Sequence, residues 1–282
     1  MRILKPQVNL DEFLRKWRRA PSKLVLLDYD GTLAPFHIQR DKALPYPGVT
    51  SRIRHLMGMP GIRVVVISGR EAREVLRLLG LKPHPEIWGA HGRQRLYPDG
   101  RIESLSLTSE QEDALSKVRN LARDMGWEKH IEEKPGCLAL HTRGIEPEKA
   151  RKIQDEFKRE SQDVIHLAHL CLHPFDGGIE VRAPDIDKGL AVKALLNEVD
   201  RNAQVVYLGD DLTDEDAFKA LSGRGLRVLV RTELRPTGAD IWIRPPDELL
   251  QFLELLGKGG EDGGTCKQTG SCLKPPSNSS SP

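Results

Sequence analysis

Two aspartates stand two positions apart at the end of the first strongly apolar segment of the chain. The sequence LVLL at residues 24–27 is followed directly by DYDGT at residues 28–32, which contains Asp28 and Asp30. Isolated carboxylates at the end of a buried segment are costly, because they lose their hydration and tend to take up protons. The pair therefore predicts that a cationic group meets Asp28 and Asp30 in the folded protein.

Further polar residues follow other predicted strands or open the helices beside them. Ser68 comes after the apolar run IRVVVI, Lys188 opens a predicted helix, and the strand VVYL is followed by Asp210, Asp211 and Asp214. In an open parallel sheet, ligands bind beyond the carboxyl ends of the strands. We therefore expect all these side chains to converge on one site with Asp28 and Asp30.

The chemistry that suits this set is phosphoryl transfer. A phosphate monoester repels an anionic nucleophile, and a hard divalent cation held by carboxylates removes that repulsion. Asp28 and Asp210, with the backbone carbonyl of Asp30, suffice for Mg²⁺, which keeps several waters. A lysine charge from Lys188 and a hydroxyl from Ser68 would hold the remaining phosphoryl oxygens. Within DYDGT, the glycine allows a sharp turn whose N–H groups can bind an anion.

The elements that position these residues alternate between strand and helix. Apolar strands are predicted at residues 23–27, 62–67 and 205–208, with helices between them. This alternation is typical of parallel strands with crossover helices, so we expect an α/β fold with a Rossmann-like parallel core. The pattern changes at residues 104–176, where two long amphipathic helices with intervening strands predict an inserted α+β cap domain.

The predicted core is therefore discontinuous, over residues 1–103 and 177–258. Residues 259–282 are rich in Gly, Ser and Pro and contain little that is apolar. Such a segment cannot bury enough surface to offset its ordering entropy, so we predict a disordered tail.

The composition excludes several classes of function. The formal charge of the 282-residue chain is +2 and only 5% of its residues are aromatic, which does not favour nucleic-acid binding. No segment approaches the length of an apolar membrane span, and the N-terminus lacks the apolar core of a signal peptide. A cytoplasmic protein acting on a small molecule is therefore expected, and the sequence gives no oligomeric state.

These motifs resemble those of the haloacid dehalogenase-like phosphatases. The DxDGT signature of that family matches residues 28–32, its second motif matches Ser68, its third Lys188, and its acidic fourth motif residues 209–214. The resemblance implies that Asp28 is a nucleophile forming an aspartyl-phosphate, and that Asp30 protonates the leaving oxygen and then activates water. It also implies a Mg²⁺ cofactor, and a cap that selects the substrate.

The resemblance further implies a role for each site residue. Phosphate is expected to contact Gly31, Thr32, Ser68, Gly69 and Lys188. The metal-binding positions implied are Asp28, Asp30, Asp210, Asp211 and Asp214. Transporting ATPases of the superfamily carry threonine where Asp30 stands, so Asp30 favours a phosphatase or a mutase.

Longer blocks are similar to the trehalose-6-phosphate phosphatase family. These blocks are DYDGTLAPF (28–36), ISGR (67–70), GAHG (89–92), EVRAPDIDKG (180–189) and GDDLTDEDAF (209–218). The first block departs from the family at Phe36, where an aliphatic residue is usual. By resemblance, the substrate is a phosphorylated disaccharide, and the residues expected to contact it are Arg70, His91, Glu132, Lys134, Arg143 and Glu180.

Three alternatives share most of these motifs. A phosphatase for mannosyl-3-phosphoglycerate or sucrose phosphate would have the same core and a different cap. A phosphomannomutase-like enzyme would return phosphate to the sugar. A catalytically silent binding domain is disfavoured by the intact set of motif residues.

Overall fold

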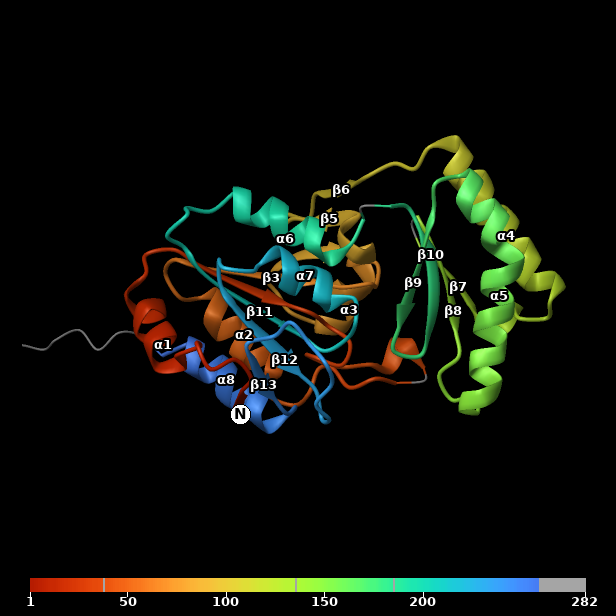
Figure 1. Cartoon of the computed structure of the whole chain (residues 1–282). Coiled ribbons are helices and arrows are strands. Elements are labelled where there is room, and N and C mark those ends of the chain that lie inside the picture. The colour runs from red at the N-terminus through yellow and green to blue at the C-terminus, as the bar shows by residue number, and fades with distance from the viewer. Residues whose placement is uncertain (38, 135, 185, 259–282) are drawn as a thin grey trace, which may run out of the picture.

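A nine-stranded sheet forms the framework of the larger part of the molecule (Figure 1). The computed structural model describes residues 1–37, 39–134, 136–184 and 186–258. The strands from β13 to β4 run parallel, whereas β1, β5 and β6 pair antiparallel at the two edges. Their spatial order is β1 (Arg2–Ile3), β13 (Ile241–Ile243), β12 (Leu226–Val230), β11 (Gln204–Gly209), β2 (Lys23–Leu27), β3 (Ile62–Ile67), β4 (Glu86–Gly89), β5 (Gln94–Leu96) and β6 (Ile102–Ser104).

The central strand β2 is apolar on both faces because helices cover both sides of the sheet. Val25 and Leu27 belong to one hydrophobic core, and Leu24 and Leu26 belong to the other. The first core includes side chains of α1 (Leu10–Arg19), α2 (Val49–Met57), α3 (Ala72–Leu79) and α8 (Asp247–Leu256). The second includes side chains of α6 (Lys188–Asn197) and α7 (Asp214–Ala220). This arrangement confirms the predicted parallel α/β core.

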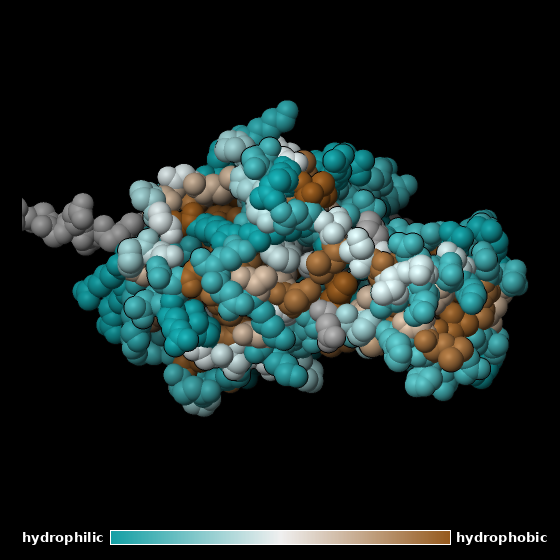
Figure 2. Space-filling view, turned by 90° about the horizontal axis from the view of Figure 1, so that it is seen from above, coloured by the Kyte–Doolittle hydropathy of each residue, from teal (hydrophilic) through white to brown (hydrophobic). Residues whose placement is uncertain are grey.

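A separate four-stranded antiparallel sheet forms the cap. Its order is β7 (Ile131–Lys134), β8 (Cys137–His141), β10 (Gly178–Arg182) and β9 (Cys171–Phe175). Helices α4 (Ser109–Asp124) and α5 (Pro147–Leu167) pack on one face of this sheet around a third hydrophobic core. The other face is turned toward the larger sheet (Figure 1), and Figure 2 shows the waist between the two lobes.

The predicted boundary at residue 177 is wrong for strand β10. Residues Gly178–Arg182 pair with β8 and β9, so this strand belongs to the cap sheet. The reason is its alternation: Ile179 and Val181 pack in the cap core, which leaves Glu180 on the opposite face. The cap therefore extends through Arg182, and the chain returns to the larger sheet after it.

Short 3₁₀ segments connect the main elements at Arg40–Lys42 (η1), Ala90–Gly92 (η2) and Glu128–His130 (η3). None of the helices within the described ranges is long and apolar enough to cross a membrane. The predicted tail at residues 259–282 lies outside the described residues.

Candidate active site

The carboxyl ends of β2, β3 and β11 open into a cavity of about 360 Å³ between the two sheets. Asp28, Ser68 and Asp210 follow these strands and line the cavity, as Lys188 does from the start of α6. The predicted convergence of these four residues is thus present. Cap residues from β7, β8 and β10 line the opposite wall.

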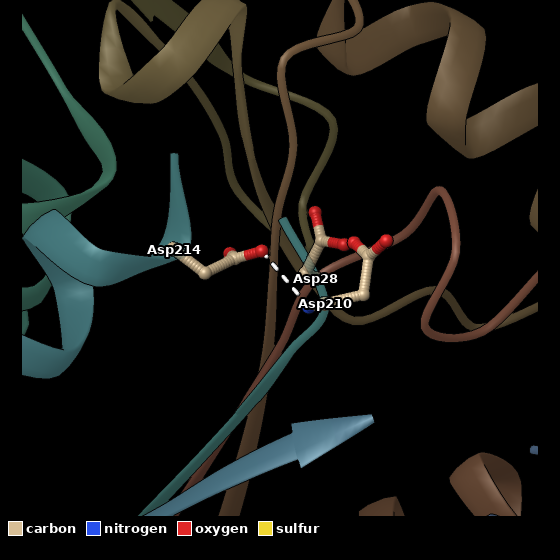
Figure 3. Close-up of side chains that lie close together, drawn as sticks. All are labelled: Asp28, Asp210 and Asp214. Atoms are coloured by element: carbon tan, nitrogen blue, oxygen red, sulfur yellow. Dashed lines mark hydrogen bonds between the residues drawn. The ribbon is translucent and has the colours of Figure 1, made fainter. Parts of the chain in front are cut away.

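Three buried carboxylates meet at the base of the cavity (Figure 3). One oxygen each from Asp28, Asp210 and Asp214 lies within 4.8 Å of the others. Lys188 Nζ lies 2.6 Å from Asp28 Oδ1 and 2.7 Å from Asp214 Oδ1. Arg231 approaches Asp210 Oδ2 more distantly, at 3.8 Å. One buried ammonium does not balance three buried carboxylates, so the cluster is built to accept a further cation.

Both oxygens of Asp28 are held in place. Lys188 donates to Oδ1, and the Thr32 hydroxyl donates to Oδ2 over 3.0 Å. Burial raises the pKa of Asp28 to about 7, and the charge of Asp214 adds to the effect while Lys188 opposes it. Burial also opposes the charge on Lys188, yet Asp214 and Asp28 keep the pKa of Lys188 above its usual value. The Thr32 side chain thus orients Asp28, and the predicted contact of Thr32 with phosphate stays a prediction.

Asp210 offers an unused oxygen. Its Oδ1 is buried and has no hydrogen-bond partner among the described residues. Gly31 permits the approach of this side chain, because a Cβ at position 31 would lie 2.1 Å from Asp210 Oδ2. The Gly31 N–H donates to the Ala34 carbonyl at 2.7 Å, so it is not free for the predicted role in phosphate binding. An orphaned carboxylate oxygen in an anionic cluster fits a hard divalent cation.

The other predicted metal positions have different partners. Asp214 Oδ2 accepts the N–H groups of Asp210 and Asp211 at 3.0 and 2.9 Å, and its Oδ1 also accepts the Tyr207 hydroxyl at 2.6 Å. Asp214 therefore orders the loop that carries Asp210. Asp211 Oδ1 accepts the N–H groups of Leu212 and Asp176. Asp211 and Asp30 do not join the carboxylate cluster found among the described residues.

Asp30 lines the cavity and is paired with a buried arginine. Arg70 Nε and Nη2 donate to its two oxygens at 2.7 and 2.8 Å, and a third nitrogen of Arg70 pairs with Glu74. Arg70 also lines the cavity, and its predicted contact with substrate stays a prediction, since each of its three side-chain nitrogens already donates to Asp30 or Glu74. Ser68 Oγ accepts the Arg70 N–H at 3.1 Å, which fixes the hydroxyl in the lining of the cavity.

The turn that contains His91 packs directly against Gly69, next to Ser68 of the second motif. A Cβ at Gly69 would lie 2.6 Å from the His91 ring, so glycine is required at that position. His91 itself has a positive φ of 57° and its Nε2 lies 3.0 Å from Glu180 Oε2. Burial lowers the pKa of His91 to about 4, although Glu180 opposes that shift. His91 is therefore neutral at neutral pH.

Glu180 projects from β10 into the cavity with charged neighbours on several sides. Arg182 donates to its Oε1 at 2.8 Å, and the Cys137 thiol lies 3.4 Å from Oε2. Burial would raise the pKa of Glu180, but His91, Lys134 and Arg182 together hold it below its usual value. The side chain is a buried anion at the cap wall of the cavity.

A second polar group from the cap surrounds Glu132. His141 Nε2 lies 2.6 Å from Glu132 Oε2, and Lys134 Nζ lies 3.6 Å from the same oxygen. Arg40, from η1 of the core, pairs with the other oxygen of Glu132. Arg143 also lines the cavity, with its guanidinium carbon 3.8 Å from the centre of the Phe36 ring. The predicted cap residues Glu132, Lys134 and Arg143 are thus brought to the cavity.

Comparison with known proteins agrees with this geometry. The family model for trehalose-phosphatase matches residues 26–237, which include all the motif residues. The chain belongs to the trehalose-phosphatase family.

Named trehalose-phosphatases from bacteria and plants are similar along most of the chain. A trehalose-phosphate phosphatase of Mycobacterium avium (strain 104) is 31% identical over 258 residues, covering 85% of this chain and 63% of the relative. A probable trehalose-phosphate phosphatase 4 of Oryza sativa subsp. japonica is 26% identical, covering 88% of this chain and 74% of that protein. The chain thus spans less than two thirds of the length of the mycobacterial relative.

Solved trehalose-phosphatase structures share the fold. The C-terminal domain of the Candida albicans trehalose-6-phosphate phosphatase superposes with a TM-score of 0.76 at 24% identity, covering 90% of this chain and 98% of that domain. An Aspergillus fumigatus trehalose-6-phosphate phosphatase gives a TM-score of 0.65 at 26% identity, with the same coverage. A haloacid dehalogenase-like hydrolase of B. subtilis gives 0.56 at 17% identity, which supports the predicted fold class.

The candidate site also contains residues that the sequence analysis missed. Arg40, Phe175 and Asp176 all line the cavity. Arg40 begins the short 3₁₀ segment η1 and its partner Glu132 lies far along the chain, so no local pattern marks the pair. Asp176 directly follows strand β9, and a polar residue at the end of a strand is the sequence feature that could have predicted its place at the site.

Proposed function

We propose that this chain hydrolyses trehalose 6-phosphate to trehalose and phosphate through a covalent intermediate on Asp28. The observation that carries the proposal is the buried Asp28 carboxylate, held by Lys188 and Thr32 beside the orphaned oxygen of Asp210. Family membership supports the same reaction. The cap wall of polar side chains supports a substrate with many hydroxyls.

In the first step, an Asp28 oxygen attacks phosphorus and the ester bond to the sugar breaks. Asp30 donates a proton to the departing sugar oxygen. In the second step, Asp30 takes a proton from water, the water oxygen attacks phosphorus, and the bond to Asp28 breaks. Arg70 supports both steps because its two hydrogen bonds fix the orientation of the Asp30 carboxylate, which lines the cavity.

Asp28 and Asp210 are the proposed ligands of a divalent cation, and Mg²⁺ is the ion we propose. Family membership and the acidic cluster both indicate a divalent metal. When bound, the cation would neutralise the carboxylates and the phosphate oxygens. Asp214 takes no part in this binding in our proposal, since its oxygens already hold Lys188, Tyr207 and the Asp210 loop.

The cap, from Ser109 to Arg182, is proposed to select the sugar. Glu132, Lys134 and Glu180 lie on the face opposite Asp28, where they can pair with hydroxyls of the second glucose ring. A site built for hydroxyls rejects an analogue that leaves its buried polar groups unpaired. Glucose 6-phosphate would leave these cap groups without partners, so its turnover should be slow.

The test is kcat/KM for trehalose 6-phosphate, glucose 6-phosphate, sucrose 6-phosphate and mannosyl-3-phosphoglycerate in the presence of Mg²⁺. We expect trehalose 6-phosphate to be hydrolysed fastest by a wide margin. A preference for either of the last two would reassign the substrate, and dependence on a sugar bisphosphate would indicate a mutase. No phosphate release from any of them would remove the proposal altogether.

A further inference from the structure

The turn between β9 and β10 contacts the core directly beside the carboxylate cluster. The Asp176 N–H donates to Asp211, with distances of 3.1 and 3.0 Å to Oδ1 and Oδ2. Asp211 follows Asp210 in the chain, so this hydrogen bond joins the cap to the loop that carries the proposed metal ligand. The donor is a backbone N–H of the cap. The hydrogen bond therefore forms only when the cap lies close to the core.

A core arginine makes the second contact with this turn. Arg231, which directly follows β12, donates from Nη2 to Asp176 Oδ2 at 2.7 Å. Its other terminal nitrogen, Nη1, lies 3.8 Å from Asp210 Oδ2. One guanidinium is therefore shared between a cap carboxylate and the carboxylate that we propose as a metal ligand.

A third contact supports the turn from within the cap. Arg143 donates to the Asp176 carbonyl and stacks against Phe36 at 3.8 Å. Phe36 belongs to the core loop after Asp28 and Asp30, and it replaces the aliphatic residue expected there. The turn is thus fixed against two different core loops, both of which carry proposed catalytic groups.

We infer that Asp176, Asp211 and Arg231 form a latch that couples docking of the cap to the readiness of Asp210 for its cation. With the cap docked, Asp176 draws the Arg231 charge away from Asp210. With the cap undocked, Arg231 keeps its contact with Asp210, and the arginine competes with the cation for that carboxylate. Arg231 is a positioning residue in this account, and the account rests on the proposed function of Asp210.

Two variants should have opposite effects on metal binding. Asp176→Asn removes the carboxylate that holds Arg231, so Arg231 turns to Asp210 and Mg²⁺ binding weakens. Arg231→Gln removes the competitor, so Mg²⁺ binding stays equal or becomes tighter. The double variant should bind like Arg231→Gln, because without the arginine the loss of Asp176 no longer matters.

Isothermal titration of the metal-free protein with MgCl₂ measures this directly. We expect the dissociation constant to rise at least about threefold in Asp176→Asn, the order of one exposed charge contact. Asp155→Asn is the matched control, since it removes an exposed cap carboxylate that pairs with Lys158 on the surface of α5. Equal dissociation constants for Asp176→Asn and Asp155→Asn, or no Mg²⁺ binding to the wild type, would overturn the coupling to the metal.

Amide hydrogen exchange tests the latch without metal or substrate. The Asp176 N–H should exchange several-fold faster in Arg231→Gln and in Asp176→Asn, while amides of β8 keep their wild-type rates. Arg101→Gln, which removes a surface arginine paired with Glu103, should leave the Asp176 amide unchanged. Wild-type protection at Asp176 in Arg231→Gln would overturn the latch. Because neither measurement uses trehalose 6-phosphate, a wrong substrate assignment would not affect the result.

Discussion

Arg70 binds Asp30 with two parallel hydrogen bonds of 2.7 and 2.8 Å, although Arg70 is 3% exposed and Asp30 is 27% exposed. Arg70 also pairs with Glu74, whose other oxygen lies 3.7 Å from Arg40. Arg40 in turn pairs with Glu132 of the cap. A row of ion pairs with alternating charge therefore connects Asp30, the proposed acid and base, to Glu132 on the cap side of the cavity.

The two hydrogen bonds from the Arg70 guanidinium to Asp30 need the planar geometry of arginine. Arg70→Lys keeps the charge but loses the two-pronged geometry, so Asp30 is no longer oriented. We expect kcat to fall by about 10- to 100-fold, as for a misplaced catalytic group. The loss should be similar for trehalose 6-phosphate and an aryl phosphate. A loss confined to trehalose 6-phosphate would indicate instead that Arg70 binds the sugar.

Asp28→Asn should abolish turnover, because an amide is a poor nucleophile and a weak metal ligand. The variant should remain folded, since Lys188 keeps its contact with Asp214. Phosphate release and circular dichroism on the same preparation check both statements. Substantial turnover by folded Asp28→Asn would exclude the covalent route.

Asp210→Asn should be more stable than the wild type without metal, and it should lose the stabilisation that Mg²⁺ gives the wild type. The substitution removes one of the buried like charges, so the metal-free protein should gain a few degrees in Tm. Mg²⁺ should raise the Tm of the wild type and leave that of the variant nearly unchanged. Thermal unfolding with EDTA or with MgCl₂ measures both effects. Equal stabilisation of the two proteins by Mg²⁺ would remove Asp210 from the proposed metal site.

Glu180→Gln should discriminate between sugar and phosphate recognition. Loss of the charge should lower kcat/KM for trehalose 6-phosphate by about 10- to 100-fold, the usual cost of a buried hydrogen bond to a charged group. An aryl phosphate does not reach the cap groups, so its kcat/KM should change little. Glutamine keeps the shape and an acceptor for Arg182, which limits the structural disturbance. Parallel losses on both substrates would show that Glu180 acts on the core.

The buried, neutral His91 predicts how stability depends on pH. Its pKa is about 4 in the folded protein, against roughly 6.5 in an unfolded chain. Between these values the unfolded chain binds more protons, so the free energy of unfolding rises with pH and is lost as pH falls. This one group contributes a slope of at most about 1.4 kcal/mol per pH unit.

His91→Asn removes that slope while tolerating the positive φ of the turn. Urea denaturation of both proteins between pH 4 and 7.5 compares the two slopes. The variant should show the shallower dependence. Superimposable curves would mean that His91 does not titrate as its burial requires.

The core could be predicted from the sequence because its signals are local. The apolar strand at residues 23–27 packs against helices on both faces, and a continuous apolar run is the direct result of that burial. Asp28, Ser68 and Asp210 converge because parallel strands end at one edge of the sheet. Strand topology and residue type were sufficient for this part of the site.

Contacts between distant side chains could not be predicted in this way. Thr32 donates to Asp28 rather than facing the cavity, and nothing in the DYDGT motif distinguishes the two orientations. Arg231 reaches Asp176 across the molecule, and a single arginine after a strand does not indicate its partner. Strand β10 was assigned to the core, and its apolar alternation fits either sheet. Only the pairing with β8 and β9 decides between them.

Both crossings between the core and the cap lie beside a single turn. The departing chain is tied there by a hydrogen bond from the Leu105 N–H to the Arg93 carbonyl, at 3.0 Å. The returning chain passes so close that a Cβ on Gly92 would lie 3.0 Å from the Asp187 carbonyl. The cap is therefore an insertion whose first and last residues leave and rejoin the core at neighbouring positions. A short linker beside Gly92 and Arg93 could replace the cap, or the cap of a related enzyme could be inserted there. Either change would alter the choice of substrate while Asp28 and Lys188 stay in place.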